Sequence, residues 1–261
     1  MRPAQRRDFP WWLVVLCITG LWVFAQVATS DLYARVVVTL SKGIGITVLV
    51  TGVGFAGAMV LGLGLAVATL SRWLLLRQAA RLYIEVMRGI PIIVLLLYVA
   101  FALVPMAVAG WNALGLPTAS TRGFPLLWRA VLALVLAYSA FIAEVFRAGL
   151  VSVDQGQIEA AEALGLNGWQ RFRLVVFPQA FRVILPPLGN DFVAMVKDSS
   201  LVSVLGVADI TQLGKVTAAG NFRYFETYNM VALIYLTMTI TLSLGLRRLE
   251  ARLRARGARG D

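Results

Sequence analysis

The chain of 261 residues contains no histidine, a single cysteine and only 13 acidic side chains. The absence of histidine excludes histidine-dependent catalytic triads and zinc sites of the H-E-x-x-H type. Cys17 has no partner for an intrachain disulfide. The phosphate-binding pattern G-x-x-x-x-G-K-[ST] is also missing, because Gly214-Lys215 has neither the earlier glycine nor a following Ser or Thr. We therefore assign this chain no catalytic residues, no metal ligands and no cofactor of its own, and we expect that it is not an enzyme.

Apolar residues supply 59% of the chain, charged residues supply only 14%, and the mean hydropathy is +0.80. A soluble domain of this length could not bury so much apolar surface, so the sequence predicts an all-α polytopic membrane protein. The net charge is +11, and the basic residues cluster between apolar runs, as the positive-inside rule produces. No polar domain offers a basic and aromatic platform, so nucleic acid is a poor candidate partner.

Six apolar stretches are expected to cross the membrane as helices. They are residues 11–28, 39–70, 83–104, 127–150, 180–206 and 228–246, of which the fifth is only moderately apolar, so that a hydropathy scan can miss it. Between them we expect a short basic turn at 71–81 and external loops at 105–125 and 206–225. A cleaved signal peptide is the competing interpretation of 11–28. We favour a retained helix, because the stretch is long and Ala25-Gln26-Val27-Ala28 is a poor cleavage site.

The distribution of basic residues predicts which loops face the cytoplasm. If the N-terminus is cytoplasmic, the inner segments hold far more arginine than the outer ones. The inner residues are Arg2, Arg6, Arg7, Arg72, Arg77, Arg81, Arg171, Arg173, Arg182 and the arginines of 247–261, and the outer ones are Arg35, Lys42, Arg122, Arg129, Lys215 and Arg223. This bias predicts cytoplasmic N- and C-termini and a cytoplasmic loop at 157–178.

Residues 157–178 form the longest polar interval between two strongly apolar regions. Residues 158–164 are nearly all good helix formers, and Gly165 then predicts a helix stop in a left-handed conformation. Asn167 can cap a second short helix, and Pro178 predicts the next break. The first of these helices would place Ala160, Ala161 and Leu164 on one face.

The spacing within this interval resembles a known motif. Glu159-Ala160-Ala161, Gly165 and Val175-x-Phe177-Pro178 resemble the EAA loop of ABC-importer permeases, with valine in place of isoleucine and phenylalanine in place of leucine. Further segments resemble the polar amino-acid uptake branch of the binding-protein-dependent permeases. These segments are Arg88-Gly89-Ile90-Pro91, residues 143–149, Gly189-Asn190-Asp191-Phe192 and residues 197–201. The resemblance extends over residues 39–246.

The resemblance implies a five-helix type I importer core, to which 11–28 would add a sixth, N-terminal helix. It divides the chain into a basic N-terminus with the extra helix (1–38), a permease domain (39–247, coupling loop 155–178) and a basic cytoplasmic tail (248–261). In this family a second permease subunit, identical or different, pairs with the first in the bacterial inner membrane. Separate ATPase subunits carry ATP and Mg²⁺, and an external binding protein delivers an amino acid. The implied contacts with the ATPase are Glu159, Ala160, Ala161, Leu164 and Gly165.

Several polar side chains interrupt the predicted fifth helix. Asp191 and Asp198 are seven residues apart and lie on nearly one face, as do Asn190 and Lys197, and none of the charges has an opposite charge at i±3 or i±4. A charge near the middle of the bilayer costs about 2.5–3.5 kcal/mol on insertion scales, so each should face a partner helix or water. We interpret Asn190 and Asp191, with Met195, as lining a substrate path, and Lys197 and Asp198 as structural.

Two further charge pairs lie near the predicted cytoplasmic ends of their helices. Glu144 and Arg147 are three residues apart on one helix face, where they can pair and reach the interface. Glu85 and Arg88 have the same spacing and a similar depth. We interpret all four as structural or gating groups.

Three classes of function remain for this sequence. The first is the permease subunit of an ATP-driven amino-acid importer that works by alternating access, or such a permease for another small polar solute. The second is an intramembrane enzyme that uses Asp191 and Asp198 as a carboxylate pair. The third is an ion-coupled transporter working alone, although no convincing inverted repeat is visible. Copurification discriminates between them, because only the first class needs an ATPase chain.

Overall fold

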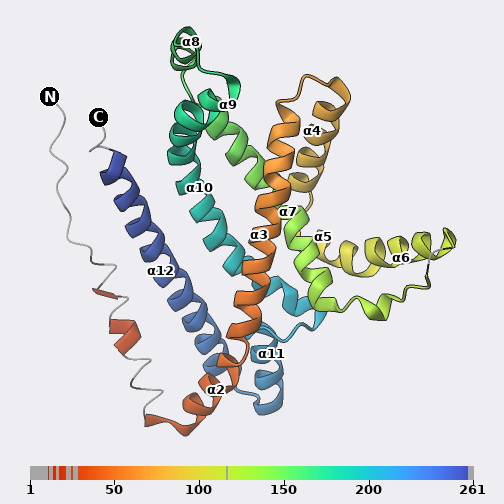
Figure 1. Ribbon diagram of the computed structural model, residues 1–261. Helices are drawn as coiled ribbons and strands as arrows, with labels where there is room; N and C mark the ends of the chain where they lie inside the picture. The colour runs from red at the N-terminus through yellow and green to blue at the C-terminus, as the bar shows by residue number, and fades with distance from the viewer. Residues whose placement is uncertain are drawn as a thin grey trace.

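The computed structural model describes residues 11, 14, 15, 18–21, 25, 29–115 and 117–257. The regular elements of this part of the chain are all helices, as the sequence predicts. They form a bundle with α8 and α9 at one end, here named the coupling-loop end, and α2 and α11 at the opposite end (Figure 1). The predicted helix 11–28 lies mostly outside the described residues.

The centre of the bundle is the packing of α3 (Ile44–Thr69) against α7 (Leu126–Val151). Small residues let the two helices approach closely. A Cβ added to Gly62 would lie 2.9 Å from both a methyl carbon of Ile142 and the backbone oxygen of Ser139. Close backbone packing of this kind is what holds helices together in lipid, where the hydrophobic effect gives no attraction between them. At the opposite end α3 is preceded by α2 (Asp31–Ser41).

The helix α4 (Leu74–Gly89) corrects two predictions. The turn expected over 71–81 is confined to the few residues before Leu74, and the span expected from residue 83 begins only after Pro91. Ile90 ends α4 in an extended conformation (φ −91°, ψ 130°), because the ring of Pro91 disfavours the helical conformation in the residue before it. Ile84 of α4 is buried with Ala140 and Ala143 of α7.

The next membrane helix begins and ends later in the chain than predicted. α5 (Ile92–Tyr98), the π-helical turn η1 (Val99–Leu103) and α6 (Val104–Ala113) follow one another without a break, so the loop expected at 105–125 begins only after Ala113. Pro105 lies in the first turn of α6, directly after the π-helical turn. The short helix η2 (Thr121–Gly123) then leads to α7.

Arg129 secures this part of the fold through backbone oxygens. Its Nη1 donates to the oxygen of Ala100 in the π-helical turn at 2.8 Å, and its Nε donates to Phe124 at 2.8 Å. A third bond joins Nη2 to the oxygen of Thr121. Because carbonyl oxygens accept these bonds, Arg129 joins η1, η2 and the start of α7 with no carboxylate partner among the described residues.

The last third of the chain forms α10 (Phe177–Asp198), the 3₁₀ turn η4 (Ser199–Leu205), α11 (Ile210–Asn221) and α12 (Tyr224–Gly257). α10 stays helical through Pro186 and Pro187 and ends before the residue 206 that the sequence predicts. The external loop expected at 206–225 contains α11. An added Cβ on Gly149 of α7 would collide with Ile184, so α7 and α10 also meet at a small residue.

A buried polar cluster holds the opposite end together. Asp209 is fully buried and caps α11 by accepting a hydrogen bond from the backbone nitrogen of Gln212 at 2.8 Å. It also accepts from the hydroxyl of Tyr235 in α12 at 3.0 Å, and Thr211 donates to that hydroxyl at 3.1 Å. Burial raises the pKa of the Asp209 carboxyl, while these hydrogen bonds oppose the shift.

Four stretches of the described residues are long and apolar enough to cross a membrane: Asp31–Thr69, Ile92–Ala113, Leu126–Val151 and Tyr224–Arg252. α10 is not among them, in accord with the expectation that hydropathy can miss it. The Pro, Asn, Asp and Lys side chains lower its hydropathy, although α10 runs through the bundle between α7 and α12 (Figure 1). The prediction of an all-α membrane fold is confirmed.

Candidate functional site

The coupling-loop end begins with the short helix α8 (Gln155–Ala163). The side chain of Asp154 caps it by accepting from the backbone nitrogen of Gly156 at 2.8 Å. Gly165 adopts φ +76°, which confirms the predicted left-handed stop. Two backbone bonds close the helix: Gly165 donates to the oxygen of Glu162 at 2.9 Å, and Leu166 donates to Ala161 at 3.1 Å. This is the Schellman arrangement, in which glycine avoids the strain of a Cβ.

The second helix, α9 (Gly168–Arg171), is fixed by the predicted cap. Asn167 and Gln170 exchange hydrogen bonds at 2.9 Å, each side chain accepting from the other residue's backbone nitrogen. Arg171 forms an ion pair with Glu162 of α8 at 2.8 Å and so ties the two helices together. The break predicted at Pro178 is wrong. The π-helical turn η3 (Phe172–Val176) joins α9 to α10, and Pro178 lies in the first turn of α10, where its missing N–H is tolerated.

The structure places the predicted ATPase contacts on two different sides of α8. Glu159, Ala160 and Gly165 are exposed, and Leu164 is 81% exposed. Ala161 is only 4% exposed, so it faces the body of the protein and not the same side as Ala160 and Leu164. The expectation of one shared face is therefore corrected. Because the loop has a fixed shape and Leu164 is exposed, this apolar side chain is available to a partner.

A second group of polar residues lies between α7 and α10, in the interior of the bundle. The hydroxyl of Tyr138 donates to Oδ2 of Asp198 at 2.8 Å. Asp191 lies seven residues earlier, about two helical turns away. Its Oδ2 is buried with no hydrogen-bond partner in the part of the chain that the structure describes. An unpaired buried carboxylate oxygen is costly, so it marks a place where another donor is expected. The sequence gives no sign of Tyr138, because the residues that meet here are far apart in the chain.

The other polar residues of α10 face elsewhere. Asn190 and Lys197 are both exposed and lie on one face, and among the described residues Lys197 forms no ion pair. No ion pair within the described chain supports the structural interpretation of Lys197, which stays a prediction. Met195 is fully buried, and an added Cβ on Gly54 would lie 3.5 Å from its sulfur. Met195 is thus part of the core and does not line a path in this conformation.

Three of the four charged residues near the coupling-loop end have a local partner. Nη2 and Nε of Arg147 donate to one oxygen of Glu144, at 2.6 and 3.0 Å, which confirms the predicted pairing. Arg88 lies over the ring of Phe141 at 5.7 Å, a cation–π contact between α4 and α7. Glu85 is exposed. These contacts support the structural interpretation of Arg88, Glu144 and Arg147.

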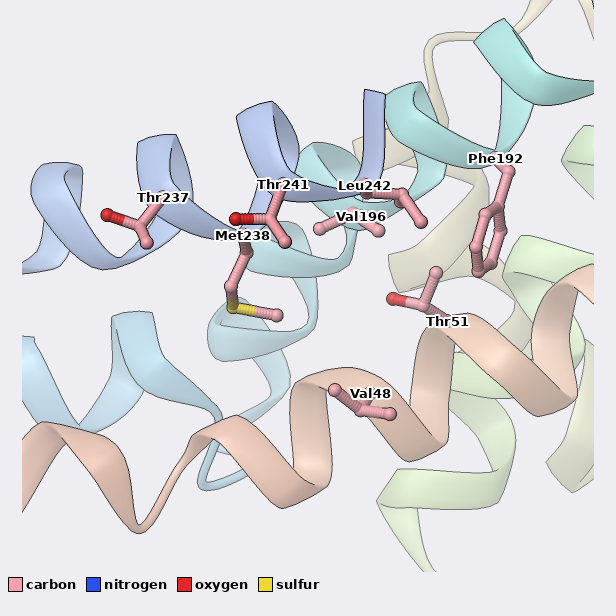
Figure 2. A pocket seen from close by; sticks show the side chains of 8 residues that line it. All are labelled: Val48, Thr51, Phe192, Val196, Thr237, Met238, Thr241 and Leu242. Carbon is pink, nitrogen blue, oxygen red and sulfur yellow. The ribbon is translucent and has the colours of Figure 1, made fainter. Parts of the chain in front are cut away.

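A cavity of about 420 Å³ lies between α3, α10 and α12 (Figure 2). Its wall is nearly all apolar, and its polar atoms are the hydroxyls of Thr51, Thr237 and Thr241. Thr51 already donates to the backbone oxygen of Thr47 at 2.8 Å. With no charged group in its wall, this cavity does not suit a zwitterion. In the ranges that the structure describes, no three His, Cys, Asp or Glu side chains gather as a metal site requires.

Comparison with known proteins identifies relatives over most of the chain. Residues 58–256 match the family model "binding-protein-dependent transport system inner membrane component". The glutamine transport system permease protein GlnP of Escherichia coli K12 is 39% identical over 216 residues, which cover 82% of this chain and 93% of that protein. The probable glutamine ABC transporter permease protein GlnM of Bacillus subtilis is 35% identical over 209 residues, or 79% of this chain and 89% of that protein.

Solved structures show the same fold. The crystal structure of an amino acid ABC transporter with histidines superimposes with a TM-score of 0.72 at 35% identity, over 86% of this chain and 99% of that chain. The MetNI methionine ABC transporter in an inward-facing form gives a TM-score of 0.64 at 20% identity, over 86% and 99%. The second likeness concerns the fold alone.

Proposed function

The chain belongs to the family of binding-protein-dependent transport system inner membrane components, and on that premise we propose that it is the permease subunit of an ATP-driven importer for amino acids. Relatives named as glutamine or amino-acid permeases support the substrate class. The observation that carries the coupling role is the loop at 154–171, which the Asp154 cap, the Gly165 stop and the Glu162–Arg171 pair hold in one shape. A loop that transmits force must keep its shape under load.

The coupling-loop end is proposed to be cytoplasmic, as the excess of arginine in its loops predicts. There Leu164 and Glu159 would contact a separate ATPase subunit, which carries the ATP and Mg²⁺. A second permease subunit would pair with this chain, and an extracytoplasmic binding protein would bring the amino acid to the end formed by α2 and α11. Closure of the ATPase would then rock the paired bundles between outward-open and inward-open states.

Asp191 is the proposed contact for the substrate ammonium group. Every free amino acid carries an α-ammonium, which donates three hydrogen bonds, and the buried oxygen of Asp191 has no donor from the described residues. Asn190 would add a neutral polar contact from the exposed side of α10. Asp198 would position Tyr138 and not bind substrate, because its oxygen already accepts from that hydroxyl.

The direct test is reconstitution. We expect the chain to copurify with an ATPase subunit, and proteoliposomes of the complex to accumulate radiolabelled amino acid only with ATP inside and binding protein outside. Liposomes with the permease alone serve as the control. Uptake by the chain alone, driven by an ion gradient, would contradict the proposal. The complex could also copurify, take up none of the amino acids in a mixture of all twenty, and take up another solute. That result would support the permease role and reject amino acids as the substrate class.

A further inference from the structure

A groove follows the exposed face of α3 from its middle to the turn that leads to α4. Two hollows form it, one of about 710 Å³ beside Val53 and Val60 and one of about 550 Å³ beside Val67 and Arg72. Gly64 lines both hollows, so they meet at this residue. We name the joined hollows the α3 groove. Both hollows are wide open, and the residues that line the larger one all belong to α3.

The lower part of the α3 groove is apolar and open. Val60 is 76% exposed and Val67 is 58% exposed. A Cβ added to Gly64 would meet nothing within 4 Å, whereas one added to Gly62 would clash with α7. No contact within the described chain therefore requires a glycine at position 64. From Val60 to Leu70 the helix rises about 15 Å, which is about half of a ~30 Å hydrocarbon core.

The upper part of the α3 groove is basic. Arg72 and Ser71 line the hollow at the turn, and Arg77 donates to the backbone oxygen of Ser71 at 3.2 Å. Among the described residues neither arginine forms an ion pair, and the first turn of α4 contains no acidic residue. Trp73, which follows Arg72, is 76% exposed, as is typical of a tryptophan at a membrane interface.

We propose that the α3 groove binds an anionic phospholipid of the leaflet on the coupling-loop side. The phosphate lies against Arg72 and Arg77, and an acyl chain lies along Gly64 and Val60. The α3 groove has positive charge without a counter-ion at its upper end. Below that charge its open apolar wall is about as deep as one leaflet. Both features match an amphiphile with an anionic headgroup. A free phosphate would leave the apolar wall uncovered. A second protein copy would have to supply both a carboxylate at Arg72 and an apolar helix.

The first experiment removes the charges. The full-length chain, in complex with its copurified subunits, is titrated with dioleoyl phosphatidylglycerol, and bound lipid is counted by native mass spectrometry. Each arginine near the interface contributes roughly a fivefold factor, so we expect Arg72→Gln with Arg77→Gln to weaken binding about 25-fold. Arg182→Gln with Arg173→Gln is the matched control, with the same loss of charge near the coupling-loop end, and should leave tight binding unchanged. Phosphatidylethanolamine, which has no net charge, should bind weakly to every variant.

The second experiment fills the apolar wall. Gly64→Leu places a side chain into the α3 groove without an internal clash, so the protein should fold and lose the tightly bound phosphatidylglycerol. Gly52→Leu is the matched control, because Gly52 is exposed on the same helix, also meets nothing within 4 Å, and lines neither hollow. The control should bind lipid as the unchanged protein does.

Three outcomes would overturn the proposal. Equal binding by the arginine pair variant and the unchanged protein would remove the headgroup contact. Equal loss in both arginine pair variants would indicate attraction by general surface charge and not a site. Efficient disulfide formation between two copies carrying Gly64→Cys, in a Cys17→Ser background, would show that a second copy covers the groove.

Discussion

Asp191 and Asp198 have the same side chain and lie on the same side of α10, yet their surroundings differ. Asp198 accepts a hydrogen bond from Tyr138 at 2.8 Å, whereas one oxygen of Asp191 is buried without a donor from the described residues. A satisfied carboxylate stabilises the fold, and an unsatisfied one is available to a ligand. Substitution of each aspartate by asparagine should therefore affect a different property of the protein.

We predict that Asp191→Asn lowers amino-acid uptake at least about tenfold, because it removes a charge-assisted hydrogen bond worth about 1.5–3 kcal/mol. Basal ATP hydrolysis and the yield of complex should change little. Asp198→Asn and Tyr138→Phe should instead lower the yield and thermal stability of the complex, since each disrupts the buried pair. Uptake by reconstituted complexes and size-exclusion yield are the two measurements.

The opposite pattern would reverse the assignment. If Asp191→Asn transports normally while Asp198→Asn folds normally and fails to transport, Asp198 is the ligand contact. If neither substitution affects uptake, this side of α10 does not line the substrate path. Tyr138→Phe separates the cases, because it removes only the donor to Asp198 and leaves both carboxylates in place.

At the scale of elements, the coupling loop depends on one backbone conformation. Gly165 has φ +76°, and its position has free space around it. Within the described chain a substitution there acts through backbone strain alone, because a new side chain would meet no neighbour. Substitution of Gly165 therefore tests whether the backbone shape of the loop is needed to transmit force.

We predict that Gly165→Val uncouples transport from ATP hydrolysis. A β-branched residue in the left-handed region is strained by about 1–3 kcal/mol, so the end of α8 should shift away from its contact with the ATPase. Uptake should fall, while the protein still inserts and the complex retains basal ATP hydrolysis. Gly165→Asn is the matched control, because asparagine tolerates this conformation, and it should retain most of the uptake. Normal uptake by Gly165→Val would reject the coupling role of this loop.

At the scale of the whole molecule, the coupling loop and the loop after α6 lie at opposite ends of α7 (Figure 1). Gly168 and Thr118 are both exposed, so a cysteine at either position can be labelled. The proposed orientation places Gly168 in the cytoplasm and Thr118 outside.

We predict that Gly168→Cys and Thr118→Cys, each in a Cys17→Ser background, react with a membrane-impermeant maleimide from opposite sides of the membrane. Gly168→Cys should label only in inside-out vesicles, and Thr118→Cys only in intact cells or right-side-out vesicles. Permeabilised membranes provide the control for reactivity. Labelling of both positions from one side would overturn the membrane topology.

The sequence by itself determined the features that depend on neighbouring residues or on composition. The apolar content requires a membrane fold, and the helix stop at Gly165 and the cap at Asn167 follow from local backbone preferences. The Glu144–Arg147 pair follows from helical spacing. These features need no information about which helices pack together.

The tertiary structure decided the features that depend on distant residues. The charges of Arg77 and Arg81 suggested a turn, yet α4 forms there because its other face packs on α3 and α7. Pro105 and Pro178 follow π-helical turns, so neither ends a helix. Met195 and Ala161 are covered by packing, and Asp198 obtains its donor from a tyrosine sixty residues earlier in the chain. Local patterns specify what a segment can form, whereas packing between segments decides which side chains remain free to bind.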